Sequence, residues 1–376
     1  MKVLLAGGGT AGHINPAIAI AGTIREKHPD AEILFIGNRD GMEQRLVKQA
    51  GFKIESVVIT GFKRSLTPKN MLHNVKTVGY SFESRSKAKK IIKEFDPDIC
   101  VGTGGYVSGP VILAACNLGY KAVIHEQNAY PGVTNKMLAK SVNRVMLANE
   151  DAKARFTDKA SFVLTGNPIR PSILATKHDE AKKRLGLDDS RPIILSFGGS
   201  LGAECINKAM AELIARSAKD KKYYHIHAYG QQGTWMPDLL KSKGVDVKNC
   251  DNLDIRQYID NMNDCLAACD LVVSRAGAIT LSEVQAKGRP AVLIPSPFVA
   301  ENHQYHNAMS MVNKKAAKLI EQADLSGELL MQTVDSMLTD PDVLTEYRRN
   351  AQQMAITDAN ERIYQTIMEV LEENRE

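Results

Sequence analysis

The sequence predicts an α/β protein with two doubly wound domains, each an open parallel sheet with helices on both faces. Short runs of apolar, often β-branched residues recur along the chain, and helical patterns fill most of the gaps between them. A strand pattern followed by a glycine-rich turn and a helix occurs twice, after residues 3–6 and after residues 193–197. This alternation is typical of parallel sheets. At 376 residues, the chain is also longer than one ordinary domain.

The first half supplies seven expected strands. They are residues 3–6, 33–36, 54–59, 99–101, 122–124, 144–147 and 162–164. Helices are expected between them, for example over residues 17–25, 42–50, 87–95 and 109–118. The sequence Thr-Gly-Asn-Pro at 165–168 interrupts the pattern. We therefore expect a first domain over residues 1–166.

The second half repeats this organisation after Arg191 and Pro192. Expected strands are residues 193–197, 224–228, 271–274, 291–294 and 318–320, with a helix over 205–215. They predict a second domain over residues 167–341. The remaining residues, 342–376, are expected to form mainly one amphipathic helix, over 342–373.

The first glycine turn, residues 7–12, is followed directly by His13. Glycines let a ligand approach the backbone closely, and the N-terminus of the next helix attracts anions. The turn also matches the G-x-G-x-x-G pattern of dinucleotide-binding proteins, but that match alone is weak. An imidazole beside such a turn can move a proton near neutral pH. A His that only caps or packs fits the spacing equally well.

Residues 274–283 form another strand–turn–helix junction, with Gly277 in the turn and a helix expected to begin near Thr280. The start of such a helix suits a pyrophosphate. Glu283, one turn further on, is placed to accept the two hydroxyls of a ribose. Thr280 and Glu283 also have the spacing of a capping box, and the sequence does not separate the two interpretations.

Polar side chains follow two other strands. His125, Glu126, Gln127 and Asn128 end the strand at 122–124, and residues 302–304, Asn-His-Gln, follow the strand at 291–294. Such groups can bind sugar hydroxyls, although a polar loop remains the simpler explanation for any one of them. Residues 102–110 add a further glycine-rich turn before a helix.

The charge is unevenly distributed. Residues 1–168 carry 23 Lys and Arg against 14 Asp and Glu, although the whole chain has a net charge of only +5. The densest basic stretch, residues 62–93, holds nine basic residues and one acid, with apolar residues between them. Anionic lipid and nucleic acid are both candidate partners, and a solvated helix face is the alternative.

Other chemistry finds little support in the sequence. The six cysteines form no C-x-x-C pair, so we expect reduced thiols in a cytosolic protein and no zinc site. We expect no signal peptide, because the apolar run after Lys2 is short, and no membrane-spanning segment, because no apolar run reaches 18 residues.

Seven motifs, in this order and spacing, resemble the MurG family of peptidoglycan glycosyltransferases, within glycosyltransferase family 28. They are GGGTAGHINPA at 7–17, VGTGGYVSGP at 101–110, HEQNAYPGVTNK at 125–136, TGNPIR at 165–170, FGGSLGA at 197–203, SRAGAITLSE at 274–283 and ENHQYHNA at 301–308. The resemblance covers nearly the whole chain. One departure is Ala11, where many members carry Gly; its methyl group should narrow the loop but keep the N–H donors.

The resemblance implies a GT-B fold, in which two Rossmann-like domains face each other across a cleft and the final helix returns to the first domain. It implies transfer of N-acetylglucosamine from UDP-N-acetylglucosamine (UDP-GlcNAc) to the C4 hydroxyl of the N-acetylmuramyl (MurNAc) group of lipid I, giving lipid II and UDP. Lipid I is undecaprenyl-pyrophosphoryl-MurNAc-pentapeptide. The protein is then expected at the cytoplasmic face of the cell membrane, bound peripherally to an anionic surface through residues 62–93. No nucleic acid partner is expected.

Site residues carried over from the family divide into three groups. The expected base is His13, with Glu126 as second candidate. Acceptor contacts are expected at Gly104, Gly105, Tyr106, His125 and Gln127. Donor contacts are expected at Thr10, Ala11, Gly12, Asn128, Arg170, Ser200, Ile259, Ala278, Ile279, Thr280, Leu281, Ser282, Glu283 and Gln304. Because GT-B enzymes generally hold the diphosphate without a bound metal, neither a required metal nor a cofactor is expected.

Three alternatives stay open at this point. A diacylglycerol glycosyltransferase or a UDP-sugar epimerase would share the fold, but the acceptor-side motifs argue against both. A nicotinamide oxidoreductase would need an acid at the end of the second strand, where the chain has Gly37-Asn38-Arg39 and Asp40 comes too late. An inactive membrane scaffold would not need His13, Glu283 or Gln304.

Overall fold

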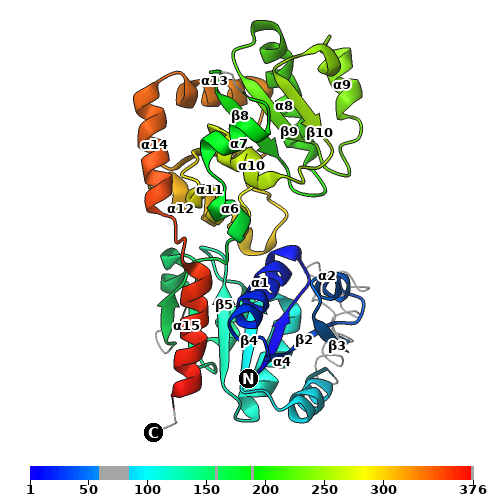
Figure 1. Ribbon diagram of the computed structural model, residues 1–376, viewed down its shortest axis with the longest axis vertical. Coiled ribbons are helices and arrows are strands. Elements are labelled where there is room, and N and C mark those ends of the chain that lie inside the picture. Colours follow the sequence, from blue (N-terminus) through cyan, green and yellow to red (C-terminus); the bar gives the residue numbers. More distant parts are fainter. Residues whose placement is uncertain (59–83, 157–159, 188–189, 374–376) are drawn as a thin grey trace. The chain divides into compact units, whose positions relative to one another are not determined.

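A computed structural model describes residues 1–58, 84–156, 160–187 and 190–373 of the chain. It divides into two compact units (Figure 1). Unit 1 is Met1–Pro168 with Asp358–Glu376, and unit 2 is Ile169–Thr357. Every strand pairing within the two sheets is parallel, which confirms the predicted α/β class.

Unit 1 contains a seven-stranded sheet in the order β3-β2-β1-β4-β5-β6-β7. Its strands are β1 Lys2–Gly7, β2 Glu32–Asn38, β3 Lys53–Val57, β4 Ile99–Gly104, β5 Ala122–Glu126, β6 Arg144–Leu147 and β7 Phe162–Leu164. Its helices are α1 Ala11–Lys27, α2 Glu43–Gln49, a segment over residues 84–95, α4 Gly105–Asn117, α5 Val133–Leu138, the 3₁₀ helix η1 Glu150–Arg155, and α15 Ala359–Glu372.

Alternation along the strands of unit 1 sends side chains to two separate cores. On β1, Val3 and Leu5 pack with helices α1 and α15, whereas Leu4 and Ala6 pack with α4 and the helical segment at 84–95. All four side chains are fully buried. Because the sheet is covered on both faces, its strands are continuous apolar runs rather than alternating ones. These runs were therefore recognisable in the sequence.

Unit 2 contains a six-stranded sheet in the order β10-β9-β8-β11-β12-β13. Its strands are β8 Ile193–Phe197, β9 Tyr224–Ala228, β10 Leu253–Arg256, β11 Leu271–Ser274, β12 Ala291–Leu293 and β13 Ala317–Leu319. Its helices are α6 Pro171–Ala175, α7 His178–Arg184, α8 Glu204–Asp220, α9 Met236–Ser242, α10 Met262–Ala268, α11 Ala278–Ala286, α12 His303–Val312, α13 Gly327–Leu338 and α14 Pro341–Gln353, with 3₁₀ helices η2 Val247–Asn249 and η3 Ala300–Asn302.

The strand orders identify where each sheet can bind a ligand. In unit 1 the order changes direction between the neighbours β1 and β4, and in unit 2 between β8 and β11. At such a switch point the two following loops leave in opposite directions and open a crevice beyond the carboxyl ends of the strands. These loops are the glycine-rich turns at 7–12, 102–106, 198–202 and 275–278. Each sheet therefore presents two of the predicted motifs at its switch point.

Three sequence expectations differ from the structure. Helix α1 begins at Ala11 and not at residue 17. Pro16 lies inside the helix, where it removes one backbone hydrogen bond without ending the helix. Strand β10 was not expected at all. The expected tail helix is two helices, α14 and α15, separated by residues 354–358.

The break in the tail follows from where each helix packs. Arg348 of α14 pairs with Asp270 in unit 2, while Ile363, Ile367 and Val370 of α15 are buried in the core of unit 1. The boundary of the units accordingly divides the expected tail segment at residue 358.

A pair of buried histidines on β9 predicts acid sensitivity. His225 and His227 are fully buried, and His225 lies edge-on to Tyr223. Burial lowers the pKa of His225 to about 3 and that of His227 to about 4. In the unfolded chain both groups bind protons below about pH 6.5. Protons therefore favour the unfolded state between pH 6.5 and 4, and these residues contribute no pH dependence above that window.

We expect the free energy of unfolding of unit 2 to fall by about 2 kcal/mol per histidine between pH 7.5 and 5. Urea titrations at several pH values, followed by fluorescence of Trp235, measure this quantity, because the only tryptophan of the chain lies in unit 2. His225→Phe keeps a ring beside Tyr223 and should remove about half of the dependence. An unchanged pH slope in that variant would contradict the assignment.

Candidate active site

The first glycine turn places His13 in the first turn of α1. Thr10 is the N-cap, and the His13 N–H donates to the Thr10 carbonyl at 3.1 Å. Thr10, Ala11 and Gly12 are exposed, and His13 is half-buried. The turn therefore presents backbone and one imidazole at the carboxyl edge of the sheet.

The imidazole of His13 is bound at its Nδ1 atom. Its Nδ1 lies 3.1 Å from the Thr103 carbonyl and 3.1 Å from Gln127 Oε1, and the Thr103 hydroxyl donates to the His13 carbonyl at 2.7 Å. Gly104, at φ 97°, lies against the ring: a Cβ there would come within 2.9 Å of Nδ1. Since both neighbours of Nδ1 are acceptors, Nδ1 carries the proton, and Nε2 is the basic atom.

Two of the expected acceptor residues, Gly104 and Gly105, lie next to this ring, and a third, Tyr106, packs against the first glycine turn. Gly104 and Gly105 are the junction of β4 and α4, and both have positive φ. A Cβ on Gly105 would come within 2.0 Å of the Gly8 carbonyl, so the two glycine turns pack closely together. Tyr106 packs against Gly9 and is half-buried. The two turns and His13 thus form one cluster in unit 1.

Glu126 is fully engaged by its own loop. The side chain is 1% exposed. Its Oε1 accepts from the backbone and side-chain nitrogens of Asn128, both at 3.0 Å, and its Oε2 accepts from Gly132 N at 3.0 Å and Asn135 Nδ2 at 2.8 Å. Four donors thus occupy both oxygens of this buried carboxylate. This geometry favours a structural role for Glu126 and keeps His13 as the first candidate for the base.

His125 and Gln127 lie beneath the cluster. They are 0% and 3% exposed, respectively. His125 Nε2 lies 2.9 Å from the Gly166 carbonyl, and burial lowers the pKa of this imidazole. Such burial favours support of the neighbouring loops over direct contact with a substrate.

Unit 2 has a pocket with a cavity volume of about 190 Å³ at the carboxyl edge of its sheet. Five of the expected donor residues line it: Arg170, Ser200, Ile259, Thr280 and Glu283. Ser200 is exposed in the glycine turn after β8, and Ile259 is 4% exposed. The remaining lining residues are Phe197, Gly199, Ala228, Gln257, Tyr258, Asp260, Met262, Leu266 and Val284.

Sequence reasoning from residue patterns missed the segment that closes this pocket, residues 257–262. It follows β10, which was not predicted, so the segment had no place in the expected sheet. Leu253-Asp254-Ile255-Arg256 does alternate apolar and charged residues, and that period of two is the signal that would have identified the strand. Tyr258, 57% exposed, is the large aromatic side chain that this segment contributes.

The carboxylate of Glu283 is paired with Arg170. Arg170 Nε donates to Oε1 at 2.7 Å, and Nη2 donates to Oε2 at 2.9 Å. The Glu283 side chain is 8% exposed, whereas that of Arg170 is 55% exposed. This pairing raises the pKa of Arg170. A bidentate, charge-assisted pair fixes the orientation of the carboxylate.

The capping-box interpretation of Thr280 and Glu283 is wrong. The N-cap of α11 is Gly277, with no side-chain cap, and Thr280 already lies in the first turn. The Leu281 N–H is bonded to the Gly277 carbonyl, so the backbone donors of the first turn point out of the helix end. Glu283 is therefore free of a capping role, and its other partner can be a ligand.

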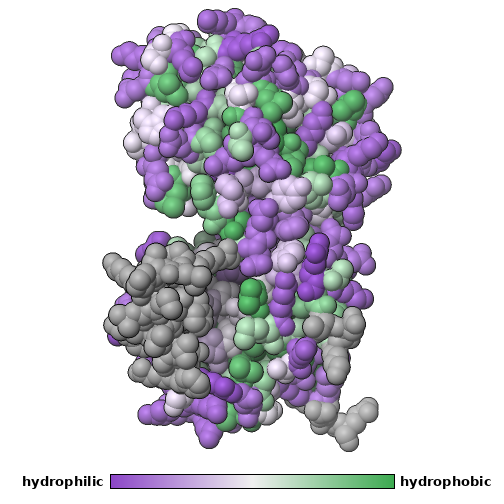
Figure 2. Space-filling view, turned by 180° about the vertical axis from the view of Figure 1, so that it is seen from behind, coloured by the Kyte–Doolittle hydropathy of each residue, from purple (hydrophilic) through white to green (hydrophobic). Residues whose placement is uncertain are grey.

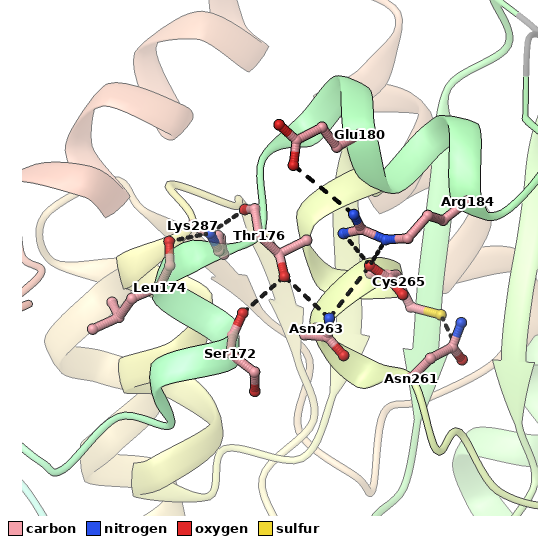
Figure 3. Close-up of polar contacts among 10 residues, drawn as sticks. Ser172, Leu174, Thr176, Glu180, Arg184, Asn261, Asn263, Cys265 and Lys287 are labelled. Carbon is pink, nitrogen blue, oxygen red and sulfur yellow. Dashed lines mark hydrogen bonds and ion pairs between the residues drawn. The ribbon is translucent and has the colours of Figure 1, made fainter.

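Helix α6 is held against α11 at both of its ends. Arg170, at its N-terminus, binds Glu283, and Lys287, one turn after Glu283, donates to the carbonyls of Leu174 at 3.1 Å and Thr176 at 2.6 Å (Figure 3). Burial lowers the pKa of Lys287. Further contacts tie α6 and α7 to α10: Asn263 donates to Thr176, and Arg184 pairs with Asp264. Arg184 also pairs with Glu180 within α7 (Figure 3). These contacts hold α6, with Arg170 at its N-terminus, against α10 and α11.

The remaining donor candidates occupy separate places. Gln304 Oε1 accepts from the Ser296 N–H at 2.9 Å and so orders the loop after β12. Leu281 is 4% exposed and belongs to the core, while Ala278, Ile279 and Ser282 are half-buried on α11. Asn128, in unit 1, is 9% exposed and donates to Glu126. Within the described residues, no cluster of three or more His, Cys, Asp or Glu side chains is arranged to hold a metal ion.

Comparison with known proteins identifies relatives over the whole chain. Residues 3–147 match the glycosyltransferase family 28 N-terminal domain, and residues 193–363 match the family's C-terminal domain. The chain is 44% identical to a protein of Acetivibrio thermocellus over 99% of this chain and 98% of the other, and 41% identical to one of Thermoanaerobacter over 98% and 100%. Both are UDP-N-acetylglucosamine--N-acetylmuramyl-(pentapeptide) pyrophosphoryl-undecaprenol N-acetylglucosamine transferases.

The fold has a solved counterpart. The crystal structure of Acinetobacter baumannii MurG is 27% identical and superposes with a TM-score of 0.77, covering 98% of this chain and 99% of the other. Two Rossmann-like domains in one chain are the architecture of GT-B glycosyltransferases, so the predicted fold class is confirmed.

Proposed function

This chain belongs to the MurG family of glycosyltransferase family 28, and we propose on that premise that it transfers N-acetylglucosamine from UDP-GlcNAc to the C4 hydroxyl of MurNAc in lipid I. The products are lipid II and UDP, in peptidoglycan synthesis. The observation that carries this proposal is the 44% identity, over 99% of the chain, to an enzyme named for this reaction. The chain is accordingly an N-acetylglucosaminyltransferase.

The pocket of unit 2 supports binding of the donor nucleotide. A carboxylate is the side chain best suited to accept both hydroxyls of a ribose, and the Arg170 pair keeps that of Glu283 oriented. Ile259 and the neighbouring backbone would contact the base, and Ser200 with the first turn of α11 would contact the diphosphate. Gln304 would contact the sugar, while Thr10, Ala11, Gly12 and Asn128, in unit 1, remain expected donor contacts.

The cluster in unit 1 supports a single displacement with one base. The acceptor hydroxyl would bind at Gly104, Gly105 and Tyr106 and give its proton to His13 Nε2 as its oxygen attacks C1 of the donor sugar. Negative charge then grows on the leaving UDP. Backbone N–H groups and the dipole of α11 are oriented to stabilise it before the reaction begins. One displacement inverts the configuration at C1.

A transfer assay tests this function. Labelled N-acetylglucosamine should move from UDP to lipid I, or to a short-chain analogue, and the product should be lipid II. Diacylglycerol should accept no label, and UDP-GlcNAc alone should yield no epimer. Label on diacylglycerol, an epimerised nucleotide sugar, or no turnover at all would each assign the chain to one of the alternative functions.

Peripheral membrane binding is the second part of the proposal. None of the helices in the described part of the chain combines the length and the apolar character needed to span a bilayer. The polyprenyl chain holds lipid I in the membrane, so the enzyme has to reach that surface. Of the basic stretch 62–93, residues 62–83 lie outside the described residues, while residues 84–93 belong to a helix that exposes Lys87, Lys90 and Lys93. On the face drawn in Figure 2, most of the coloured surface belongs to polar residues, with apolar residues among them.

Binding to anionic vesicles is therefore expected to be tight at low salt and to weaken as salt rises. Each basic residue near the surface contributes about 1 kcal/mol, screened within about one Debye length. Apolar residues of the stretch, such as Leu66, Met71, Leu72, Val75 and Phe82, should leave a salt-resistant remainder. Reversing Lys69, Lys76 and Lys87 to Glu should abolish vesicle sedimentation and spare transfer to a soluble acceptor. Equal binding to neutral and anionic vesicles would refute the proposal.

A further inference from the structure

A chain of hydrogen bonds runs from His13 into the interior of unit 1. Gln127 Oε1 lies 3.1 Å from His13 Nδ1, and Gln127 Nε2 lies 3.0 Å from both the Nδ1 and the backbone carbonyl of His125. His125 Nε2 in turn lies 2.9 Å from the Gly166 carbonyl. The two interior members, His125 and Gln127, are 0% and 3% exposed.

Backbone carbonyls fix the direction of every bond in this chain. A carbonyl only accepts, so the Gln127 atom beside the His125 carbonyl must be the NH₂ group, and the atom facing His13 must be the oxygen. The same NH₂ group donates to His125 Nδ1, so the proton of that ring lies on Nε2 and is donated to the Gly166 carbonyl. The pattern is consistent only with a neutral His125, and burial lowers the pKa of that ring accordingly.

We infer that Gln127 is a positioning residue, which holds His13 in the tautomer with the proton on Nδ1 and the lone pair on Nε2. The inference rests on the proposed function, in which His13 Nε2 takes the proton of the acceptor hydroxyl. Without an acceptor at Nδ1, imidazole populates both neutral tautomers, and only one of them has a basic Nε2. Gln127 therefore acts on the reaction through His13 and needs no contact with the substrate.

The Thr103 carbonyl limits the loss of kcat that we expect when Gln127 is replaced. It also accepts from His13 Nδ1, at 3.1 Å, and remains in place in any Gln127 variant. Loss of Gln127 should therefore weaken the tautomer preference without abolishing it. Removal of the partner that orients a metal-bound histidine typically costs about 10–100-fold, and we take the same range for a histidine that acts as the base. We expect kcat of Gln127→Met to fall by about that factor, with KM for UDP-GlcNAc unchanged.

Two variants separate the acceptor from the bulk of the side chain. Gln127→Met keeps approximately the volume and removes the oxygen that faces His13. Gln127→Glu keeps an oxygen toward Nδ1 and, with its second oxygen protonated, a donor toward His125, so it should retain the tautomer and a kcat closer to that of the wild type. Gln49→Met, at an exposed position of α2, is the matched control and should change neither quantity.

Long-range ¹H–¹⁵N spectra of histidine-labelled protein read the tautomer directly, with the His13 signals assigned by their loss in His13→Ala. The wild type should show protonated Nδ1 and unprotonated Nε2 at neutral pH, and Gln127→Met should show a mixture. A wild-type His13 protonated on Nε2 would overturn the inference, as would Gln127→Met with wild-type kcat and tautomer. Absence of transfer in the wild type would instead refute the proposed function, and the spectrum would still decide the tautomer.

Discussion

His13→Ala is expected to lower kcat by about 10²–10⁴-fold, the usual contribution of a general base, and to leave the affinity for UDP nearly unchanged. The imidazole lies in unit 1 with Nδ1 bound to Thr103 and Gln127, so Nε2 is its reactive nitrogen. The pocket that we propose for the nucleotide is formed by unit 2 alone. Steady-state kinetics and calorimetric titration with UDP measure the two quantities separately.

The control for this variant is His178→Ala. It removes a partly exposed imidazole on α7 that contacts the neighbouring Asp179. It should change neither kcat nor UDP affinity. A wild-type rate in His13→Ala would remove His13 from the mechanism and make Glu126 the first candidate. Glu126 would then have to exchange at least one of its four donors for the acceptor hydroxyl.

Glu283→Ala is expected to weaken UDP binding by about 10–100-fold, through loss of a charge-assisted contact to the ribose. It should not unfold unit 2, because the Arg170 side chain that it leaves behind is 55% exposed and remains solvated. Titration with UDP and thermal melting distinguish the two effects. Unchanged UDP affinity together with a large drop in Tm would leave Glu283 only a structural role.

Two variants serve as controls for Glu283. Glu346→Ala breaks an exposed ion pair with Lys315 in the same unit and should alter neither affinity nor Tm appreciably. Arg170→Ala leaves the carboxylate of Glu283, 8% exposed, without its guanidinium partner. It should therefore lower Tm more than Glu283→Ala does, because an unpaired buried charge costs more than an unpaired exposed one.

The fold was predictable where strands are buried on both faces. Strands β6, β8, β9 and β11 begin and end at the expected residues, since apolar runs bounded by turns mark such strands. The edge strand β7 was also expected at the right residues, because all three of its residues are apolar. Strand β10 escaped because it lies at the edge of its sheet and carries Asp254 and Arg256, which pair with each other. The start of α1 was misplaced because Pro16 is ordinarily a helix boundary.

The candidate site was predictable as a set of loops but not as a set of contacts. Glycine turns after strands identify the switch points, and a polar cluster such as residues 125–128 indicates a site. The ion pair of Arg170 with Glu283 joins residues 113 positions apart, and no local pattern carries that information. Likewise, the four donors of Glu126 come from the fold of its own loop. Sequence alone could not distinguish this saturated carboxylate from a catalytic one.

The structure of the product tests the central claim most directly. Wild-type protein, given UDP-GlcNAc and a lipid I analogue, should yield a disaccharide whose NMR spectrum shows N-acetylglucosamine β-linked to O4 of MurNAc. The donor sugar is α-linked to UDP, so a β-linkage records one inverting displacement, and linkage to O4 identifies the attacking hydroxyl. An α-linkage, attachment at another oxygen, or a nucleotide sugar altered without transfer would contradict the account.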